Sequence, residues 1–171
     1  MDENERNDAA GSTGPTSTPS TKEPPLVFTG RWPGTLDDKG RLVVPAKVRD
    51  AVVRSRQGLH FFLGPGPGKT LVLYDQENFK KLLARLADKL RDDPRRQSFE
   101  RRFYSRLEMV ECDKAGRILV SEELRVHAGI ERDVLVVGAN ERVEIWNPSA
   151  WNQLLAATDD GGFEDVARSW F

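Results

Sequence analysis

Residues 37–41 read Asp-Asp-Lys-Gly-Arg, and residues 113–117 repeat the pattern as Asp-Lys-Ala-Gly-Arg. Each copy leads into three aliphatic residues, Leu-Val-Val in the first and Ile-Leu-Val in the second. Aspartate at the first position and glycine at the fourth favour a type I turn in which the glycine takes a positive φ. The two copies therefore predict two equivalent hairpin turns, which place Arg41 and Arg117 at the start of their return strands.

The similarity between the two regions extends beyond the turns. Phe-Phe-Leu-Gly at 61–64 is matched by Leu-Val-Val-Gly at 135–138, and Leu-Val-Leu-Tyr-Asp at 71–75 is matched by Val-Glu-Ile-Trp-Asn at 143–147. The offset falls from 76 residues at the turns to 72 at the last pair, which assigns the extra residues of the first copy to loops. Two copies of about 75 residues indicate a duplicated domain, and because neither half can cover its own sheet, we expect the halves to interlock.

Each half follows the order strand, turn, strand, short helix, hairpin and longer helix. This order predicts an α+β fold that is mainly β. We expect strands at 26–32, 42–44, 59–63, 70–74, 107–112, 117–120, 133–137 and 142–146, and helices at 46–53, 75–91, 95–104, 121–127 and 148–157. Asp75, Ser121 and Asn147 stand where N-caps are needed.

The helix expected at 75–91 carries apolar residues at helical spacing, which predicts a buried stripe. These residues are Phe79, Leu82, Leu83, Leu86 and Leu90. The stretch that follows, 95–106, is rich in arginine. Such a charge run is more typical of a solvated or subunit-contacting face than of a DNA groove.

Both ends of the chain differ in composition from the middle. Residues 1–25 are polar, with little to bury, and are expected to be a disordered leader. Residues 158–171 are expected to be an acidic tail. We expect the core between the two ends to consist of a first repeat at 26–92, followed by a basic helix and the second repeat at 93–157. Each end carries a net charge of −3, so the overall −1 leaves the core at +5, which is compatible with DNA without being evidence for it.

Several classes of function lack the residues that they need. Cys112 is the only cysteine, so an intrachain disulfide or a cysteine metal cluster is excluded. The glycine-proline loop at 64–70 is not a P-loop, because Leu63 occupies the place of the first glycine. We therefore expect no catalytic residue, cofactor, metal or small-molecule substrate. No apolar run reaches transmembrane length, and a cytoplasmic protein is expected.

The sequence resembles the MraZ family of the AbrB/SpoVT-like superfamily over residues 28–157. The resemblance is carried by Phe-Thr-Gly at 28–30, Leu-Asp-Asp-Lys-Gly-Arg at 36–41, Val-Pro-Ala at 44–46, Glu-Arg-Arg-Phe-Tyr at 100–104, the second turn at 113–118 and Glu-Ile-Trp at 144–146. Serine replaces the proline of Val-Pro in the second copy, a departure that removes no motif residue.

The resemblance implies a double-swapped-hairpin barrel formed by two AbrB-like repeats within one chain, and assembly of the chain into a homo-oligomeric ring. It also implies a nucleoid-associated transcriptional regulator that binds short G-containing direct repeats upstream of its own operon, in the division and cell-wall gene cluster. The DNA-binding signature of the family falls on Asp37 and Arg41, and on Asp113 and Arg117.

The residue types at the turns suit DNA recognition. An arginine can donate two hydrogen bonds to guanine in the major groove, which also admits a two-stranded β-ribbon. Asp37 and Asp113 can orient the arginines, and Lys39 and Lys114 at the tips can contact phosphates.

Three other interpretations stay open. In the first, the aspartate and arginine of each turn form a surface ion pair without any role in DNA binding, worth about 0–1 kcal/mol. The chain can be a scaffold or protein-interaction ring without DNA readout. A nucleotide-handling enzyme acting through the glycine-proline loop is the third alternative.

Overall fold

The computed structural model describes residues 26–54, 58–158 and 162–170, so the leader predicted at 1–25 lies outside the described residues. The strands are β1 (Phe28–Thr35), β2 (Arg41–Val43), β3 (His60–Pro65), β4 (Thr70–Tyr74), β5 (Glu108–Glu111), β6 (Arg117–Leu119), β7 (Asp133–Asn140) and β8 (Arg142–Trp146). The helices are α1 (Ala46–Arg54), α2 (Gln76–Lys89), α3 (Arg96–Tyr104), α4 (Glu122–Ala128), α5 (Pro148–Thr158) and α6 (Gly162–Trp170). The predicted α+β class is confirmed.

The strands form one six-stranded antiparallel sheet, in the order β1-β7-β8-β4-β3-β5, and a two-stranded sheet of β2 and β6. The first strand of each repeat pairs with the third strand of the other: β1 pairs with β7, and β5 pairs with β3. The last strands, β4 and β8, also pair with each other. The expectation that the two halves interlock is therefore confirmed, since every one of these pairings joins the two repeats.

The two-stranded sheet joins the equivalent return strands of the repeats. Its central pair is Leu42 and Ile118, which stand at the same position in the two copies. The sheet is extended by two matching hydrogen bonds, from the Val120 N–H to the Gly40 carbonyl and from the Val44 N–H to the Gly116 carbonyl, each 2.9 Å long. The two turns are thus held together by backbone bonds rather than by side chains alone.

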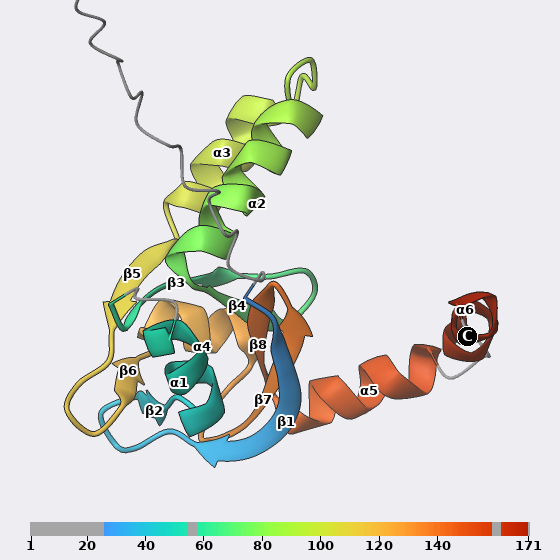
Figure 1. Ribbon diagram of the computed structural model, residues 1–171. Helices are drawn as coiled ribbons and strands as arrows, with labels where there is room; N and C mark the ends of the chain where they lie inside the picture. Colours follow the sequence, from blue (N-terminus) through green and yellow to red (C-terminus); the bar gives the residue numbers. More distant parts are fainter. Residues whose placement is uncertain (1–25, 55–57, 159–161, 171) are drawn as a thin grey trace, which may run out of the picture.

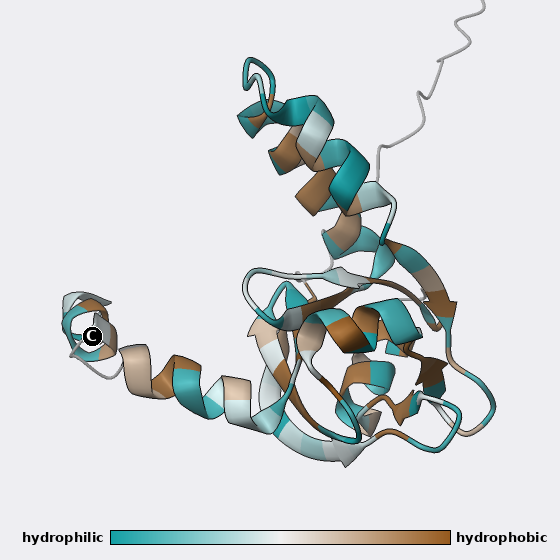
Figure 2. Ribbon diagram, turned by 180° about the vertical axis from the view of Figure 1, so that it is seen from behind, coloured by the Kyte–Doolittle hydropathy of each residue, from teal (hydrophilic) through white to brown (hydrophobic). Residues whose placement is uncertain are grey.

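The core lies between the small sheet and the bend of the six-stranded sheet. Figures 1 and 2 show α1 and α4 within this bend, beside β2 and β6. Val48 and Val52 of α1 and Leu124 and Ala128 of α4 are buried there. Because both short helices and both return strands share this core, the positions of the two turns depend on contacts from the whole molecule.

Local signals for the helix ends are confirmed. The Asp75 carboxylate accepts hydrogen bonds from the N–H groups of the first turn of α2, and the Ser121 hydroxyl accepts one from the Leu124 N–H. The Asn147 side chain caps α5 in the same way, through the Ser149 and Ala150 N–H groups. These side chains satisfy donors that have no partner within the helix.

Two predicted features differ in detail. The mixed apolar region around 26–32 contributes to the first strand, and β1 runs from Phe28 to Thr35. Pro33 is accommodated because β1 is an edge strand of the sheet, where a missing N–H removes no ladder bond. On α2, only Phe79 of the expected stripe is buried, while the four leucines are half-buried. The reason is visible in Figure 1, where α2 leaves the sheet after its first turns and has α3 as its neighbour along the projecting part.

The acidic C-terminal segment contains a helix that was not predicted. The nine residues of α6 place Phe163, Val166 and Trp170 on one face, with exposed fractions of 80%, 60% and 81%. Figure 1 shows α6 beyond the end of α5, away from the body of the molecule. The spacing of these apolar residues is the helical signal that the low overall hydrophobicity of the segment concealed.

Gly138→Ala is expected to destabilise the fold more than Gly64→Ala, although the two glycines are equivalent in the repeat. A Cβ at Gly138 would lie 2.6 Å from the backbone nitrogen of Thr29 on the paired strand, whereas at Gly64 the nearest atom is a Leu107 methyl carbon at 3.1 Å. A side-chain tip can move, but a paired backbone cannot. We expect the free energy of unfolding to fall by about 1–3 kcal/mol for Gly138→Ala, measured by urea denaturation; equal losses would contradict this reading.

Candidate nucleic-acid interface

The first turn, residues 37–41, is closed by its own aspartate. The Asp37 carboxylate oxygen Oδ1 accepts hydrogen bonds from the N–H groups of Lys39, at 3.0 Å, and Arg41, at 2.9 Å. The Gly40 N–H donates to the Asp37 carbonyl at 2.8 Å, and Gly40 takes a φ of 75°. The glycine is required because a side chain at that φ would be strained.

The second turn, residues 113–117, repeats this geometry closely. The Asp113 Oδ1 atom accepts from the N–H groups of Ala115 and Arg117, both at 2.9 Å, and Gly116 has a φ of 74°. The predicted type of turn, with a positive-φ glycine at its fourth position, is therefore present twice. The backbone of both loops is rigidified by the same set of short bonds.

The aspartates also hold the two arginines. The Arg41 Nε donates to the Asp37 Oδ2 at 2.8 Å, and the Arg117 Nε donates to the Asp113 Oδ2 at 2.9 Å. Arg117 Nη1 additionally lies 3.6 Å from the Asp37 Oδ2, across the junction between the repeats. The four residues that were singled out as two separate pairs thus form one charged cluster above β2 and β6.

The arginines are oriented without being enclosed. Each side chain has an exposed fraction of 31%. Among the residues that the structure describes, the hydrogen bonds of each guanidinium run through Nε. The Nη1 and Nη2 edge of Arg41 is consequently available to a planar acceptor pair, which is the chemistry that guanine O6 and N7 present. For Arg117, Nη1 also lies 3.6 Å from the Asp37 carboxylate, so Nη2 is its more accessible donor.

The aspartates stay ionised because they accept several hydrogen bonds. The backbone N–H of Arg41 is the main cause that holds the pKa of Asp37 below its ordinary value of 3.8, with the Arg41 side chain adding to it. For Asp113 the backbone N–H of Arg117 has the same effect on the pKa. Hydrogen bonds to a carboxylate favour its charged form.

Acidification is therefore expected to disrupt the turns only below the ordinary carboxyl range. A carboxyl whose folded pKa is depressed contributes stability above its unfolded pKa, near 3.8, and that contribution is lost as the pH falls through the folded pKa. A carbon-detected NMR titration of the two aspartates measures this directly. Arg41→Ala should raise the pKa of Asp37 only in part, because the backbone donors remain. A value of 3.8 or higher in the unaltered protein would contradict the turn geometry.

Lys39 and Lys114 are exposed at the tips of the two turns, as expected. Two further arginines, Arg49 and Arg125, were not predicted. A Cβ at Gly116 would lie 2.7 Å from the Arg49 guanidinium, and one at Gly40 would lie 3.5 Å from that of Arg125. Arg49 and Arg125 are 76 residues apart, so the repeat offset was the signal that could have found them.

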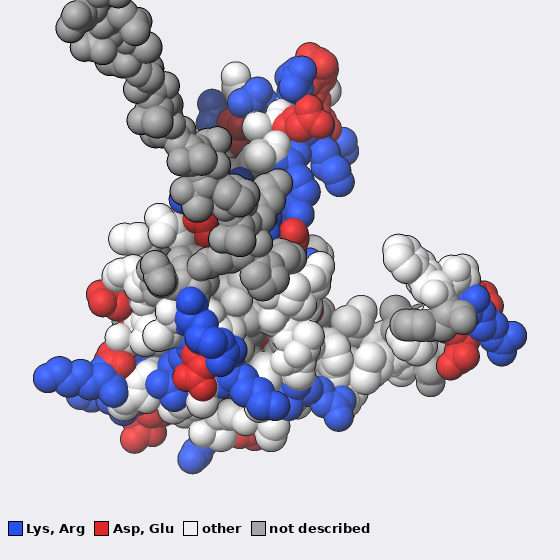
Figure 3. All heavy atoms as spheres, in the orientation of Figure 1, with Lys and Arg blue, Asp and Glu red and all other residues white. Residues whose placement is uncertain are grey.

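The two sides of the cluster differ in charge. The first repeat contributes α1 with Lys47, Arg49 and Arg54, whereas α4 of the second repeat begins with Glu122 and Glu123. Figure 3 shows Lys and Arg side chains gathered over α1 and at the end of the molecule that carries the turns. Because Arg49 of α1 approaches Gly116, the surface beside the second turn is the more favourable one for an anionic partner.

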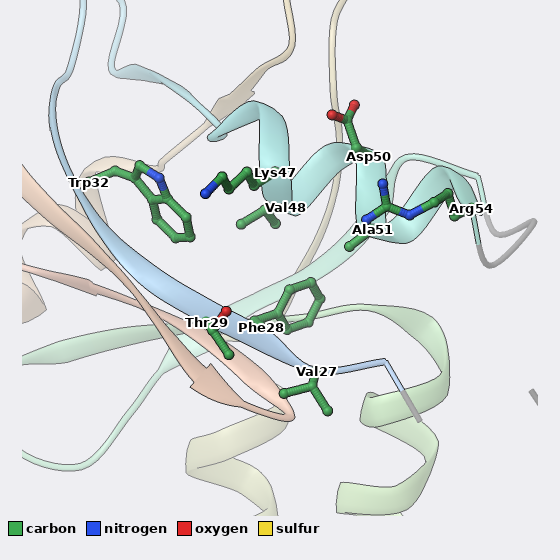
Figure 4. Close-up of a pocket in the computed structure, with 9 residues that line it drawn as sticks. All are labelled: Val27, Phe28, Thr29, Trp32, Lys47, Val48, Asp50, Ala51 and Arg54. Atoms are coloured by element: carbon green, nitrogen blue, oxygen red, sulfur yellow. The ribbon is translucent and has the colours of Figure 1, made fainter. Parts of the chain in front are cut away.

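A hollow of about 340 Å³ lies between β1 and α1, and none of the predicted site residues lines it. Figure 4 shows the Lys47 side chain directed toward the ring of Trp32 at this hollow, with Asp50 and Arg54 further along the helix. Within residues 26–54, 58–158 and 162–170, no three His, Cys, Asp or Glu side chains are grouped so that they could hold a metal ion. Over the same residues, no helix is long and apolar enough to cross a membrane.

The fold and the cluster define a two-repeat protein whose equivalent turns present paired arginines on a shared β-ribbon. The MraZ protein family matches the chain twice, at residues 27–102 and 103–169, and the chain belongs to that family. The two matches correspond to the two copies of the turn.

Several relatives carry the name transcriptional regulator MraZ. The protein of that name from Thermomicrobium roseum is 39% identical over 134 residues, which are 77% of this chain and 91% of the relative. Those from Cytophaga hutchinsonii and a Thermoanaerobacter species are 33% and 36% identical, over 84% and 83% of this chain and 93% and 95% of the relatives.

Proposed function

We propose that this protein is a sequence-specific DNA-binding regulator of transcription without enzymatic activity. The observation that carries the proposal is the pair of guanidinium groups, Arg41 and Arg117, each held by Nε on one two-stranded ribbon and each partly exposed. Relatives that are named transcriptional regulators support it.

The geometry suits the major groove of DNA. A two-stranded β-ribbon fits that groove, and an arginine fork can donate to both O6 and N7 of a guanine. In this proposal Arg41 and Arg117 read guanines, Asp37 and Asp113 fix the forks in place, and Lys39 and Lys114 contact phosphates. Because phosphate contacts position without specifying, the sequence preference would come from the arginines.

The proposal extends to assembly and target. A single ribbon has few contacts, so we infer that the chain acts as a homo-oligomeric ring in which several ribbons engage spaced direct repeats and raise affinity through effective concentration. The double-swapped-hairpin barrel implied by the resemblance belongs to this proposal, and the cross-repeat pairings of β1 with β7 and β3 with β5 support it. The target would be G-containing repeats upstream of its own operon, in the division and cell-wall cluster, and the protein would be cytoplasmic and nucleoid-associated.

A scaffold or protein-interaction ring of the same fold is the second candidate. The overall charge of −1 and the acidic residues at the start of α4 favour it, because they weaken non-specific attraction to DNA. The two candidates differ in how DNA affinity depends on salt.

The binding constant for duplex DNA taken from just upstream of the gene is expected to fall steeply with salt. Neutralisation of phosphates releases counterions, with a slope of about −0.9 in log K against log [salt] for each phosphate contacted. Fluorescence anisotropy at several salt concentrations measures the slope, and a footprint locates the bound repeats. A scrambled duplex of the same length is the control. Equal affinity for both duplexes would exclude sequence-specific reading, and no affinity for either would leave the scaffold as the function.

A further inference from the structure

We propose that α6 of one copy docks into an apolar groove between the helical arm and the sheet of a neighbouring copy. This groove is the α2–α3 groove, lined by Val72, Tyr74, Leu82, Phe99, Phe103 and Arg102 among others. The proposal rests on the self-assembly part of the proposed function and names the surfaces that would carry it.

The helix α6 needs a partner surface. It has nine residues, and an isolated helix of that length is marginal in water. Its apolar residues Phe163, Val166 and Trp170 share one face and are largely exposed. A stripe of this kind on a short helix is stabilised by packing rather than by propensity, so α6 should be covered in the assembled protein.

The α2–α3 groove has the size and the apolar lining that a binding surface for α6 requires. It encloses about 500 Å³ on a mostly apolar lining, enough for large aromatic side chains such as Phe163 and Trp170. A second hollow adjoins it, sharing Pro67 and Arg142, and reaches Trp146 and Trp151 beside α5. Leu82 and Leu86, two of the half-buried leucines of α2, line the groove and would be covered by a neighbour that occupies it.

The charges of the α2–α3 groove complement those of α6. Arg102, Arg106 and Arg142 line the groove, and no acidic residue does. On α6, Glu164 and Asp165 are in the first turn and directly follow Phe163. Arg106 already pairs with Glu123 and Arg142 with Glu144, whereas Arg102 has no ion pair within the part of the chain that the structure describes. Glu164 of one copy and Arg102 of the next are therefore the complementary pair.

The contact is between copies and not within one. Figures 1 and 2 show α5 carrying α6 away from the body, while α2 and α3 project in a different direction. When a helix on one side of a subunit binds a groove on a different side of the next subunit, the contact is head-to-tail. Repeated contacts of this kind close into a ring if the rotation between neighbouring subunits allows closure. A C-terminal helix held this way would link each subunit to the next.

Phe163→Ala with Trp170→Ala tests the docking. Both side chains are about four-fifths exposed, so the variant should fold as the original protein does. Because buried aromatic anchors dominate interfaces, the protein concentration at half-assembly should rise at least about thirtyfold, measured by analytical ultracentrifugation. Unchanged assembly of the variant would overturn the proposal, and binding of α6 to phosphatidylglycerol vesicles instead would assign the stripe to a membrane surface.

A charge exchange shows whether the contact joins two copies. Glu164→Arg and Arg102→Glu should each weaken assembly by about tenfold, because each places like charges together. A mixture of the two variants should recover assembly, since the altered helix of one meets the altered groove of the other. No recovery on mixing would overturn docking between copies. Lys89→Glu, on the same arm but outside the groove lining, is the matched control.

The outcomes separate this inference from the proposed function. An original protein that stays monomeric at all concentrations would remove both the ring and the docking. An assembled protein whose oligomers ignore the α6 and groove variants would remove the docking alone. DNA reading is judged by its own footprint and salt slope, which do not depend on α6.

Discussion

Arg41→Ala is expected to weaken binding to the upstream repeat DNA by about 1–3 kcal/mol for each engaged turn, and Arg41→Ala with Arg117→Ala is expected to abolish the preference for G-containing repeats. The physical reason is that each guanidinium, tied through Nε to its aspartate, offers a preset two-donor edge to a guanine. Fluorescence anisotropy with repeat and scrambled duplexes measures both affinity and preference.

Two controls separate base reading from charge. Arg41→Lys keeps the positive charge but lacks the planar fork, so we expect the salt slope to be kept and the preference for guanine to fall. Arg101→Ala removes an exposed arginine of α3 and should leave both unchanged. Circular dichroism should show an intact fold in all cases, because Asp37 keeps its bonds to the turn backbone. Full preference in the double variant would exclude these arginines as readers.

The features that the sequence predicted well are those that depend on neighbours along the chain. The turns at 37–41 and 113–117 and the caps at Asp75, Ser121 and Asn147 are each made by a side chain and backbone groups within four residues. Such bonds involve only residues that are close along the chain, so a local pattern can predict them.

The features that were missed depend on pairing between distant segments. That β2 pairs with β6, and so brings Arg117 to 3.6 Å from Asp37, follows from the interlocked sheet and not from either turn. Arg49 and Arg125 approach the opposite turn for the same reason. The repeat indicated that two arginines exist, but only the topology unites them in one cluster.

The half-buried leucines of α2 and the exposed stripe of α6 have a different cause. An amphipathic pattern predicts that one face of a helix is buried, but it does not predict which surface covers that face. Within one chain these two faces stay partly open. In the proposed assembly a neighbouring copy would cover both faces, which would account for the burial that the sequence pattern predicts and a single subunit lacks.

Ile118→Ala is expected to lower the free energy of unfolding by about 2–5 kcal/mol. Ile118 is fully buried at the centre of β6, opposite Leu42 of β2, directly within the ribbon that carries both arginines. Loss of its side chain leaves a cavity in the core shared by the two repeats. Because Leu42 occupies the equivalent place, Leu42→Ala should cost a similar amount, measured by urea denaturation of both variants.

The neighbouring Leu119 is the matched control, because it belongs to the same strand but is 54% exposed. Leu119→Ala should therefore change the free energy of unfolding by less than about 1 kcal/mol.

If the ribbon and the main sheet form one cooperative unit, unfolding of Ile118→Ala stays a single transition. Fluorescence of the four tryptophans and backbone circular dichroism should then change together. Separate transitions would show that the ribbon unfolds on its own, and the arginines would then owe their placement to the turns alone.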